Sequence, residues 1–212
     1  MSSAKTVDTK SETKLEKNTY HHGDLRSSLV DAASNMLKEG GIDGLSLRKL
    51  ADKVGVSRTA PYHHFKDKNE LLCAIAEGGF SRWQQDATAI FNQQNLSPLE
   101  KYRQFIQGYI AYAADNPELY DLMFGRTIWK QNTATQGLRD VAYPSFHQQV
   151  TMTRQWQQQG LMPAGEDTLR LAQVTWGTIH GIARLLIDGI YADRSHIDEM
   201  CDCAVNLFCS EH

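Results

Sequence analysis

Apolar side chains recur at spacings of three to five residues along most of the chain, as they do on amphipathic α-helices. Capping and breaking residues divide this pattern into about nine segments. No segment alternates apolar and polar residues as a strand does, and no unit of sequence is repeated. The chain is therefore expected to be all-α. The expected helices span residues 24–40, 46–54, 57–65, 67–90, 97–113, 116–124, 144–159, 167–190 and 196–208.

Local signals fix several of these boundaries. Asp67 followed by Glu70 is typical of a capped helix start. Ser57 is placed to cap a short helix in which Pro61 is the fourth residue, where proline interrupts few helical hydrogen bonds. The segment 167–190 is apolar nearly all round, which predicts contacts on more than one side.

Two short helices joined by the turn Gly55-Val56-Ser57, with a helix before them, predict a helix-turn-helix. The charge distribution agrees with this prediction. Residues 46–68 carry six Lys and Arg against two Asp, a net charge of +4, whereas residues 160–212 carry three Arg against eight Asp and Glu, a net charge of −5. A chain with one basic end suits a protein that places that end on nucleic acid.

The second short helix would present Arg58, Thr59, Tyr62 and His63 to a partner. Arginine can donate two hydrogen bonds to guanine in the major groove, and neighbouring polar groups can hold phosphates. A zinc site at His63-His64 is disfavoured, because neighbours on a helix point about 100° apart and no cysteine lies nearby. A catalytic pair lacks a nucleophile or carboxylate close in sequence, and a merely solvated helix would need no such turn. We therefore expect no enzyme activity, metal or cofactor.

Composition adds further limits. At 212 residues, 41% hydrophobic and 22% charged, the chain is typical of a soluble globular protein. No apolar run approaches the roughly 20 residues that span a bilayer, and no apolar signal core is present. The four cysteines favour reduced thiols in the cytoplasm. Cys201 and Cys203 would lie about 200° apart on a helix, which favours packed thiols over a metal site and leaves oxidation sensing as the alternative.

The stretch "LSLRKLADKVGVSRTAPYHHFKDK", residues 45–68, closely resembles the DNA-binding domain of the tetracycline-repressor (TetR) family, and "YHHGDLR" looks like one branch of it. The resemblance covers about residues 20–70 and implies that Ser46 and Arg48 begin the positioning helix. Pro61 departs from the aliphatic residue common at that position. Arg58, Thr59 and His63 would contact bases, and Tyr62, His64 and Lys68 would contact phosphates. The expected DNA-binding residues are Ser46, Arg48, Ser57, Arg58, Thr59, Tyr62, His63, His64 and Lys68.

The C-terminal portion of TetR proteins usually binds a small molecule and dimerises. Here "WGTIHGIARLL", residues 176–186, looks like a subgroup with a Trp-x-x-x-His-Gly motif. Residues 1–19 are mainly Ser, Thr, Lys and Glu with almost no apolar side chains, which predicts a disordered arm. The resemblance implies a DNA-binding domain at 20–67 and a helical effector-binding and dimerisation domain at 68–212.

Rings and thioethers in this portion predict an apolar ligand cavity, although aromatic residues at helical spacing also form ordinary cores. His180, on an otherwise apolar helix, fits a satisfied core histidine or a ligand donor. The expected ligand-binding residues are Tyr109, Tyr112, Met123, Phe124, Trp129, Phe146, Met152, Trp156, Trp176 and His180.

The last two helices are the expected dimer surface, since glycines on one side of the first allow close approach and the second offers an apolar face. Two such pairs would form a four-helix interface about a two-fold axis. The expected interface residues are Gly177, Gly181, Leu185, Ile197, Val205, Leu207 and Phe208.

These features predict a homodimeric repressor that leaves a palindromic double-stranded DNA operator when a small apolar or aromatic effector binds, without a membrane partner. Two alternatives stay open. One is a constitutive DNA-binding protein without an effector, and the other is an all-α carrier or enzyme that contains a similar turn.

Overall fold

The computed structural model describes residues 25–191 and 194–209, so the expected arm at 1–19 lies outside the described residues. The described residues form nine α-helices and two 3-10 segments without any strand, which confirms the all-α prediction. The elements are α1 (Leu25–Gly44), α2 (Leu47–Val54), η1 (Ala60–His63), α3 (Lys68–Phe91), α4 (Pro98–Asp115), α5 (Pro117–Phe124), α6 (Arg126–Trp129), α7 (Gln136–Gln158), α8 (Thr168–Ile187), η2 (Arg194–His196) and α9 (Ile197–Phe208).

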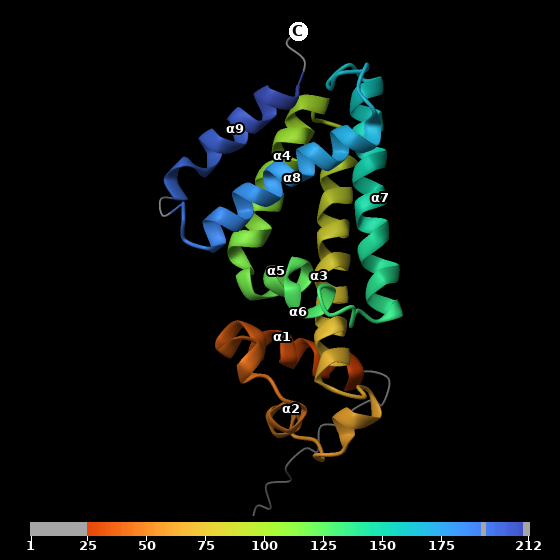
Figure 1. The fold of residues 1–212 in the computed structure, drawn as a ribbon, viewed down its shortest axis with the longest axis vertical. Coiled ribbons are helices and arrows are strands. Elements are labelled where there is room, and N and C mark those ends of the chain that lie inside the picture. The colour runs from red at the N-terminus through yellow and green to blue at the C-terminus, as the bar shows by residue number, and fades with distance from the viewer. Residues whose placement is uncertain (1–24, 192–193, 210–212) are drawn as a thin grey trace, which may run out of the picture.

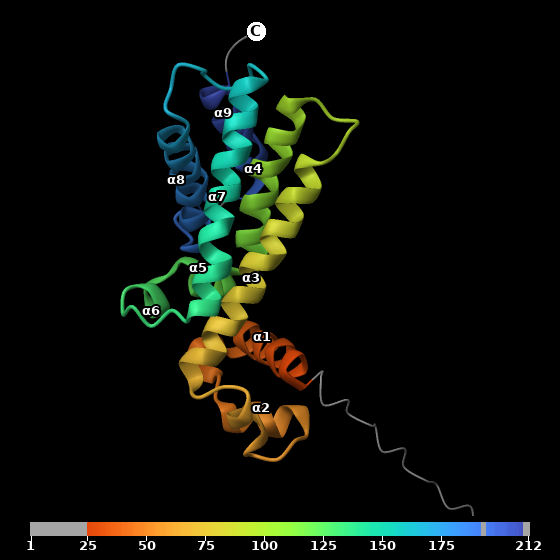
Figure 2. The same ribbon diagram turned by 90° about the vertical axis from the view of Figure 1, so that its right-hand side faces the viewer.

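The long helix α3 connects the two ends of the molecule. Its first turns lie beside α1, α2 and η1 at one end, and the rest runs between α4 and α7 (Figures 1 and 2). Helices α8 and α9 cover α4 on the far side (Figure 1). We call α1, α2 and η1 the helix-turn-helix unit.

The helix-turn-helix unit shares its hydrophobic core with the rest of the chain. Leu29, Leu50 and Phe65 belong to one buried cluster, and that cluster continues into Leu122 of α5 and Leu138 of α7. A second cluster lies among α3, α4, α7, α8 and α9. A movement of α5 or α7 therefore reaches the helix-turn-helix unit through direct apolar packing.

The sequence prediction of an α-helix over residues 57–65 is wrong, because the structure has only the 3-10 segment η1 there. Pro61 has no N–H to donate to the Ser57 carbonyl, as an α-helix would require. The Ala60 N–H takes that carbonyl instead at 3.0 Å, and Tyr62 N–H bonds to the Thr59 carbonyl at 3.1 Å. Hydrogen bonds between residues three apart, where an α-helix bonds residues four apart, define a 3-10 turn.

The expected start of a helix at Pro144 is also wrong, since α7 begins at Gln136 and passes through the proline. Thr135 caps it by accepting a hydrogen bond from the Leu138 N–H at 3.2 Å. Leu138 and Ala142 are buried, and this packing outweighs the helical bond that Pro144 cannot make.

Other start signals act as the sequence predicts. Ser97 and Glu100 form a complete capping box at α4, and the Asp67 side chain accepts a hydrogen bond from the Glu70 N–H at 2.9 Å at the start of α3. Inside α1, Gly41 has φ of 61°, which breaks the helix near the predicted stop.

Candidate functional site

The helix-turn-helix unit presents an exposed polar surface along η1 and the turn before it. Arg58, Thr59 and His63 are exposed, and Tyr62 has 56% of its surface exposed. The Arg58 Nε lies 3.7 Å from Asp52 Oδ1, and both side chains are exposed. Such a solvated ion pair is weak, so the guanidinium is free to exchange it for another acceptor.

Other predicted DNA contacts make bonds inside the protein. Ser46 Oγ accepts a hydrogen bond from the Lys49 N–H at 3.2 Å and caps α2. Arg48, the second residue of α2, is exposed. Ser57 Oγ lies 3.2 Å from Thr59 Oγ1. These contacts fix the backbone of the turn beneath the exposed side chains.

Lys68 and His64, like Ser46, are half-buried. The Lys68 ammonium donates a hydrogen bond to the Ile42 carbonyl at 2.6 Å, which joins the start of α3 to the end of α1. Two of its N–H groups stay available for another acceptor. His64 is half-buried, with its ring centroid 6.5 Å from that of Phe65.

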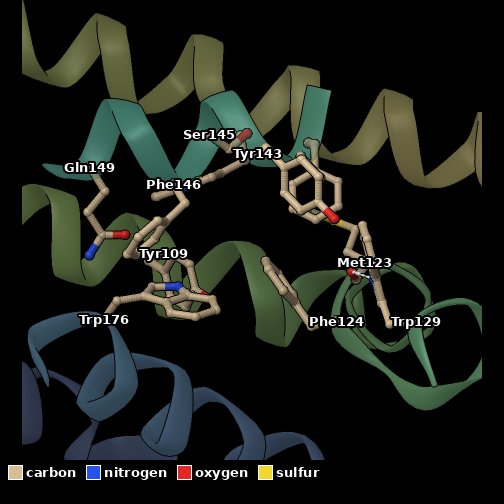
Figure 3. Close-up of a pocket in the computed structure, with 12 residues that line it drawn as sticks. Tyr109, Met123, Phe124, Trp129, Tyr143, Ser145, Phe146, Gln149 and Trp176 are labelled. Carbon is tan, nitrogen blue, oxygen red and sulfur yellow. Dashed lines mark hydrogen bonds between the residues drawn. The ribbon is translucent and has the colours of Figure 1, made fainter. Parts of the chain in front are cut away.

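A second feature is an apolar pocket of about 340 Å³, open to solvent on one side and lined by residues of helices α3 to α8 (Figure 3). We call it the aromatic pocket. Figure 3 shows Gln149, Phe146 and Trp176 toward one end of it and Trp129 and Met123 toward the other. Its lining residues are Phe80, Trp83, Tyr109, Met123, Phe124, Trp129, Ala142, Tyr143, Ser145, Phe146, Gln149 and Trp176.

Six of the ten residues predicted to bind a ligand line this pocket: Tyr109, Met123, Phe124, Trp129, Phe146 and Trp176. The other four lie outside the lining, each for a visible reason. Tyr112 donates a hydrogen bond to the Gly79 carbonyl at 2.9 Å, and Met152 and Trp156 are buried in the second core cluster. His180 lies behind the pocket wall, where its ring contacts Trp176 at 5.2 Å between centroids.

Sequence analysis missed six lining residues. Phe80 and Trp83 stood in a pattern that predicted a helix, and the same pattern could have marked them as candidates because they are large aromatic residues. Ser145 and Gln149 lie in the segment predicted as a helix but carry no aromatic signal, and Tyr143 lies just before it, in the part of α7 that the prediction omitted. Ala142 carries no signal of its own.

A hydrogen-bonded chain of side chains closes the back of the pocket. The Trp176 indole N–H donates to the Tyr109 hydroxyl at 3.1 Å, that hydroxyl lies 2.8 Å from the Tyr120 hydroxyl, and the latter lies 2.5 Å from His180 Nδ1. With His180 neutral and accepting, one consistent set of donors runs from Trp176 through both tyrosines to the imidazole. The polar groups of these four side chains, which come from α4, α5 and α8, therefore all have hydrogen-bond partners.

Burial keeps this chain uncharged. Desolvation raises the pKa of Tyr109 and Tyr120 well above the usual range of a phenol. Desolvation also lowers the pKa of His180, and the nearby Arg184 guanidinium lowers it further. Arg184 itself pairs with Asp121 and, at 2.6 Å, with Asp188, which links α8 to α5 at the surface.

The predicted dimer residues do not all face outward. A Cβ added to Gly177 or Gly181 would have no atom of the chain within 4 Å, and Leu207 has 72% of its surface exposed. Val205, in contrast, is 0% exposed within its own chain, so it supports α9 from inside. Val174, which the prediction did not include, is 59% exposed on α8. Gly181, Leu185, Ile197 and Phe208 are only partly exposed.

Other chemistry is limited in the part of the chain that the structure describes. Residues 25–191 and 194–209 contain no cluster of three His, Cys, Asp or Glu able to hold a metal ion. No helix in these ranges has the length and apolarity to cross a membrane. Cys201 is buried and Cys203 exposed, and burial raises the pKa of Cys201 and Cys209 to about 11. A thiol with so high a pKa forms little reactive thiolate at neutral pH.

Two family models match the chain on either side of the middle of α3. "Bacterial regulatory proteins, tetR family" matches residues 29–75, and "Tetracyclin repressor-like, C-terminal domain" matches residues 102–208, half of the chain. The chain belongs to the TetR family. It is a DNA-binding transcriptional regulator with a helix-turn-helix, in a family of regulators rather than enzymes.

Individual relatives agree with this assignment. A solved structure of a protein with unknown function from Rhodococcus sp. RHA1 is 32% identical, with a TM-score of 0.79 over 91% of this chain and 97% of that one. The class D tetracycline repressor of Escherichia coli is 51% identical over 51 residues, 24% of this chain and 23% of the repressor.

The nucleoid occlusion factor SlmA of Vibrio vulnificus is 29% identical over 131 residues, 61% of this chain and 65% of that protein. The chain thus spans less than two thirds of either of these two curated relatives. These partial matches support the assignment of a DNA-binding domain, and they say nothing about which ligand this chain binds.

The neutral state of His180 leads to a prediction about pH. Below about pH 6.5, the ordinary pKa of histidine, the unfolded state binds a proton that the folded state resists. The free energy of unfolding should therefore fall as the pH falls below this value, and less so in His180→Gln, which keeps an acceptor for Tyr120. Urea denaturation across this pH range measures the difference. His147→Gln replaces a histidine that is exposed on α7, outside this hydrogen-bonded chain, and is measured alongside as a control for the substitution itself. If the pH dependence of His180→Gln is the same as that of the parent, the assignment is contradicted.

Proposed function

We propose that this TetR-family regulator is a homodimeric repressor, and that a small molecule in the aromatic pocket releases it from a palindromic operator. The observation that carries the proposal is the course of α3. Lys68 at its first turn is bonded to α1, and Phe80 and Trp83 on the same helix line the pocket.

The distance along α3 suits direct transmission. Phe80 lies twelve positions after Lys68, which is about 18 Å along the helix at 1.5 Å per residue. A ligand that displaces the pocket end of a packed helix moves its other end as well, because an α-helix bends little over three turns. The helix-turn-helix unit would follow α3 and change its separation from the partner copy.

Helix α5 offers a parallel connection. Its Met123 and Phe124 line the pocket, while Leu122 belongs to the core cluster of the helix-turn-helix unit. Helices α3 and α5 are also tightly packed, since a Cβ on Gly79 would come within 2.6 Å of Met123 Sδ. A ligand against Met123 therefore presses on both helices that hold α1.

Release requires selective binding and not merely tight binding. A ligand that favours both separations equally shifts nothing, and a change from 1:99 to 99:1 needs about a 10⁴-fold preference. Two half-sites in successive major grooves lie about 34 Å apart, so a small rotation of each unit is enough to lose register.

The first prediction concerns operator binding. Selection from a random DNA pool should enrich a palindrome with half-sites about one helical turn apart. Arg58→Ala should weaken binding to that palindrome about tenfold or more, because a bidentate arginine–guanine contact contributes about 1–3 kcal/mol. Fluorescence anisotropy at fixed salt measures both proteins.

The matched control is Arg82→Ala, which removes one exposed cation from α3 outside the helix-turn-helix unit. It should bind the operator nearly as well as the parent. If no sequence is enriched and Arg58→Ala behaves like the parent, the proposed reading surface is wrong. A selected operator that no small molecule releases would instead favour a constitutive regulator.

The second prediction concerns dimerisation through the open side of α8. Gly181→Leu adds a side chain on the open side of α8, where an added Cβ meets no atom of the chain within 4 Å, and leucine favours a helix by about 0.8–1 kcal/mol over glycine. The side chain would instead occupy the space for a partner helix. We expect the dimer dissociation constant to rise at least about tenfold, with thermal stability of the chain retained. Sedimentation velocity measures the dimer.

Gly78→Leu is the matched control, since Gly78 also lies in a helix with nothing within 4 Å of an added Cβ. It should remain dimeric. A Gly181→Leu protein with the same dimer affinity as the parent would exclude this side of α8 from the interface.

A further inference from the structure

The aromatic pocket contains no ionisable acid or base other than two phenols. Eight of its twelve lining residues are aromatic, and none is Asp, Glu, Lys, Arg or His. One of the phenols, Tyr109, keeps its proton because burial raises its pKa above the usual range. This composition bears on the class of ligand, an inference that rests on the proposed function and extends it.

A charged ligand would enter this pocket at a cost. An anion would lose its water without meeting a cationic side chain, and burial of an unpaired ion is strongly unfavourable. A cation would meet ring faces, but no carboxylate lines the cavity. Several rings also turn their edges to one another, as Trp83 does toward Tyr109 at 82° and Phe80 toward Phe124 at 77°. An uncharged ligand avoids the desolvation cost.

The walls favour a flat ligand over a flexible one. Phe146 and Trp176 have ring centroids 5.9 Å apart, and Trp129 and Tyr143 have centroids 6.4 Å apart. These rings have few rotatable bonds and present flat surfaces, which planar rings cover by offset stacking. A flexible alkyl chain would make the same area of contact only by losing more conformational entropy.

The pocket's polar groups are mostly occupied. The Trp129 indole N–H donates to the Met123 carbonyl at 2.6 Å, and Ser145 Oγ donates to the Val141 carbonyl at 3.1 Å. The Tyr109 hydroxyl and the Trp176 N–H bond to each other. Among the described residues, the Gln149 side-chain amide, the Trp83 indole N–H and the Tyr143 hydroxyl have no hydrogen-bond partner. Of these groups only the amide carries both two donors and a carbonyl acceptor, and it lies toward one end of the pocket (Figure 3). A ligand can therefore gain a directional bond there.

We infer that the aromatic pocket binds an uncharged, planar, fused-ring molecule with a hydrogen-bonding atom at its edge that reaches the Gln149 amide. The rings of the pocket supply the contact area, and Gln149 sets the orientation. Polar ligands with charges at both ends and flexible acyl chains fit this lining less well.

Tryptophan fluorescence gives a direct readout, because three of the four tryptophans line the pocket. The fourth, Trp156, lies outside it, and its buried indole N–H has no hydrogen-bond partner among the described residues. Trp156→Phe therefore removes the background signal without removing a hydrogen bond. This variant is the reporter for all titrations.

The probes are acridine under mildly alkaline conditions, where it is uncharged, N-methylacridinium, acridine-9-carboxylate and decanol. Acridine should quench the reporter and bind at least about tenfold more tightly than the other three. Gln149→Leu should weaken acridine binding about three- to tenfold by removing a neutral hydrogen bond. Gln148→Leu is the matched control, since the Gln148 side chain bonds to Thr88 outside the pocket.

Each other outcome overturns a stated part of the inference. Equal binding of either charged probe contradicts the uncharged class, and tighter binding of decanol contradicts the planar class. An unchanged affinity in Gln149→Leu removes the assigned orientation, and absence of quenching by acridine rejects the inference as a whole.

A parallel operator-release assay separates this inference from the proposed function. If N-methylacridinium releases the operator and acridine does not, the switch stands and the ligand class is wrong. If acridine binds tightly and leaves operator affinity unchanged, the ligand class stands and the proposed switch is wrong.

Discussion

The packing of α3 is the constraint on which the rest of the structure depends. Its Leu71 and Ile75 are buried in the core shared with α1 and α2, and its Trp83 and Ala87 are buried in the second cluster. The 24 residues of α3 form a single continuous helix, and a helix of that length spans about 36 Å. Both clusters pack against the same rigid helix. A rearrangement of one cluster that moves α3 therefore also changes the packing of the other.

The motif Trp176-x-x-x-His180-Gly181 acquires a physical meaning from this arrangement. Residues four apart lie on nearly the same side of a helix, whereas the next residue points about 100° away. Trp176 and His180 accordingly face α4 and α5, where they contact Tyr109 and Tyr120. Gly181 lies beside them on the side that no other part of the chain approaches within 4 Å of an added Cβ. One short stretch of α8 thus carries a pocket wall, a buried hydrogen-bond chain and a surface open to a partner.

How far the sequence predicts the structure depends on whether a signal is local. Three helix starts depend on local caps, in which a side chain accepts a hydrogen bond from the N–H three residues later: Ser46, Asp67 and Ser97. The starts of these helices could therefore be predicted from the sequence. The start of α7 could not, because the packing of Leu138 against α3 overrides Pro144. At Pro61 the prediction failed because a local effect was underestimated. In so short a segment, the missing N–H of Pro61 is enough to turn an α-helix into a 3-10 segment.

The candidate pocket shows the same division. Rings of α4 and α5 could be proposed from residue type alone, yet Trp156 and Trp176 look alike in sequence, and only the latter lines the cavity. Gln149 has no distinguishing signal in the sequence, because its importance comes from its position beside the rings of the pocket in three dimensions.

Coupling between pocket and operator, if carried by α3 and α5, must act in both directions. A ligand that lowers operator affinity by a given factor is itself bound more weakly by the same factor when the operator is present. In the proposed switch Met123 would carry this coupling, since it lines the pocket and lies against α3 at Gly79. Trp176 and Gly177 are neighbours on α8, so a ligand that shifts Trp176 also shifts the side of the helix open to a partner copy. Ligand, operator and dimer geometry are then linked through the same few helix contacts.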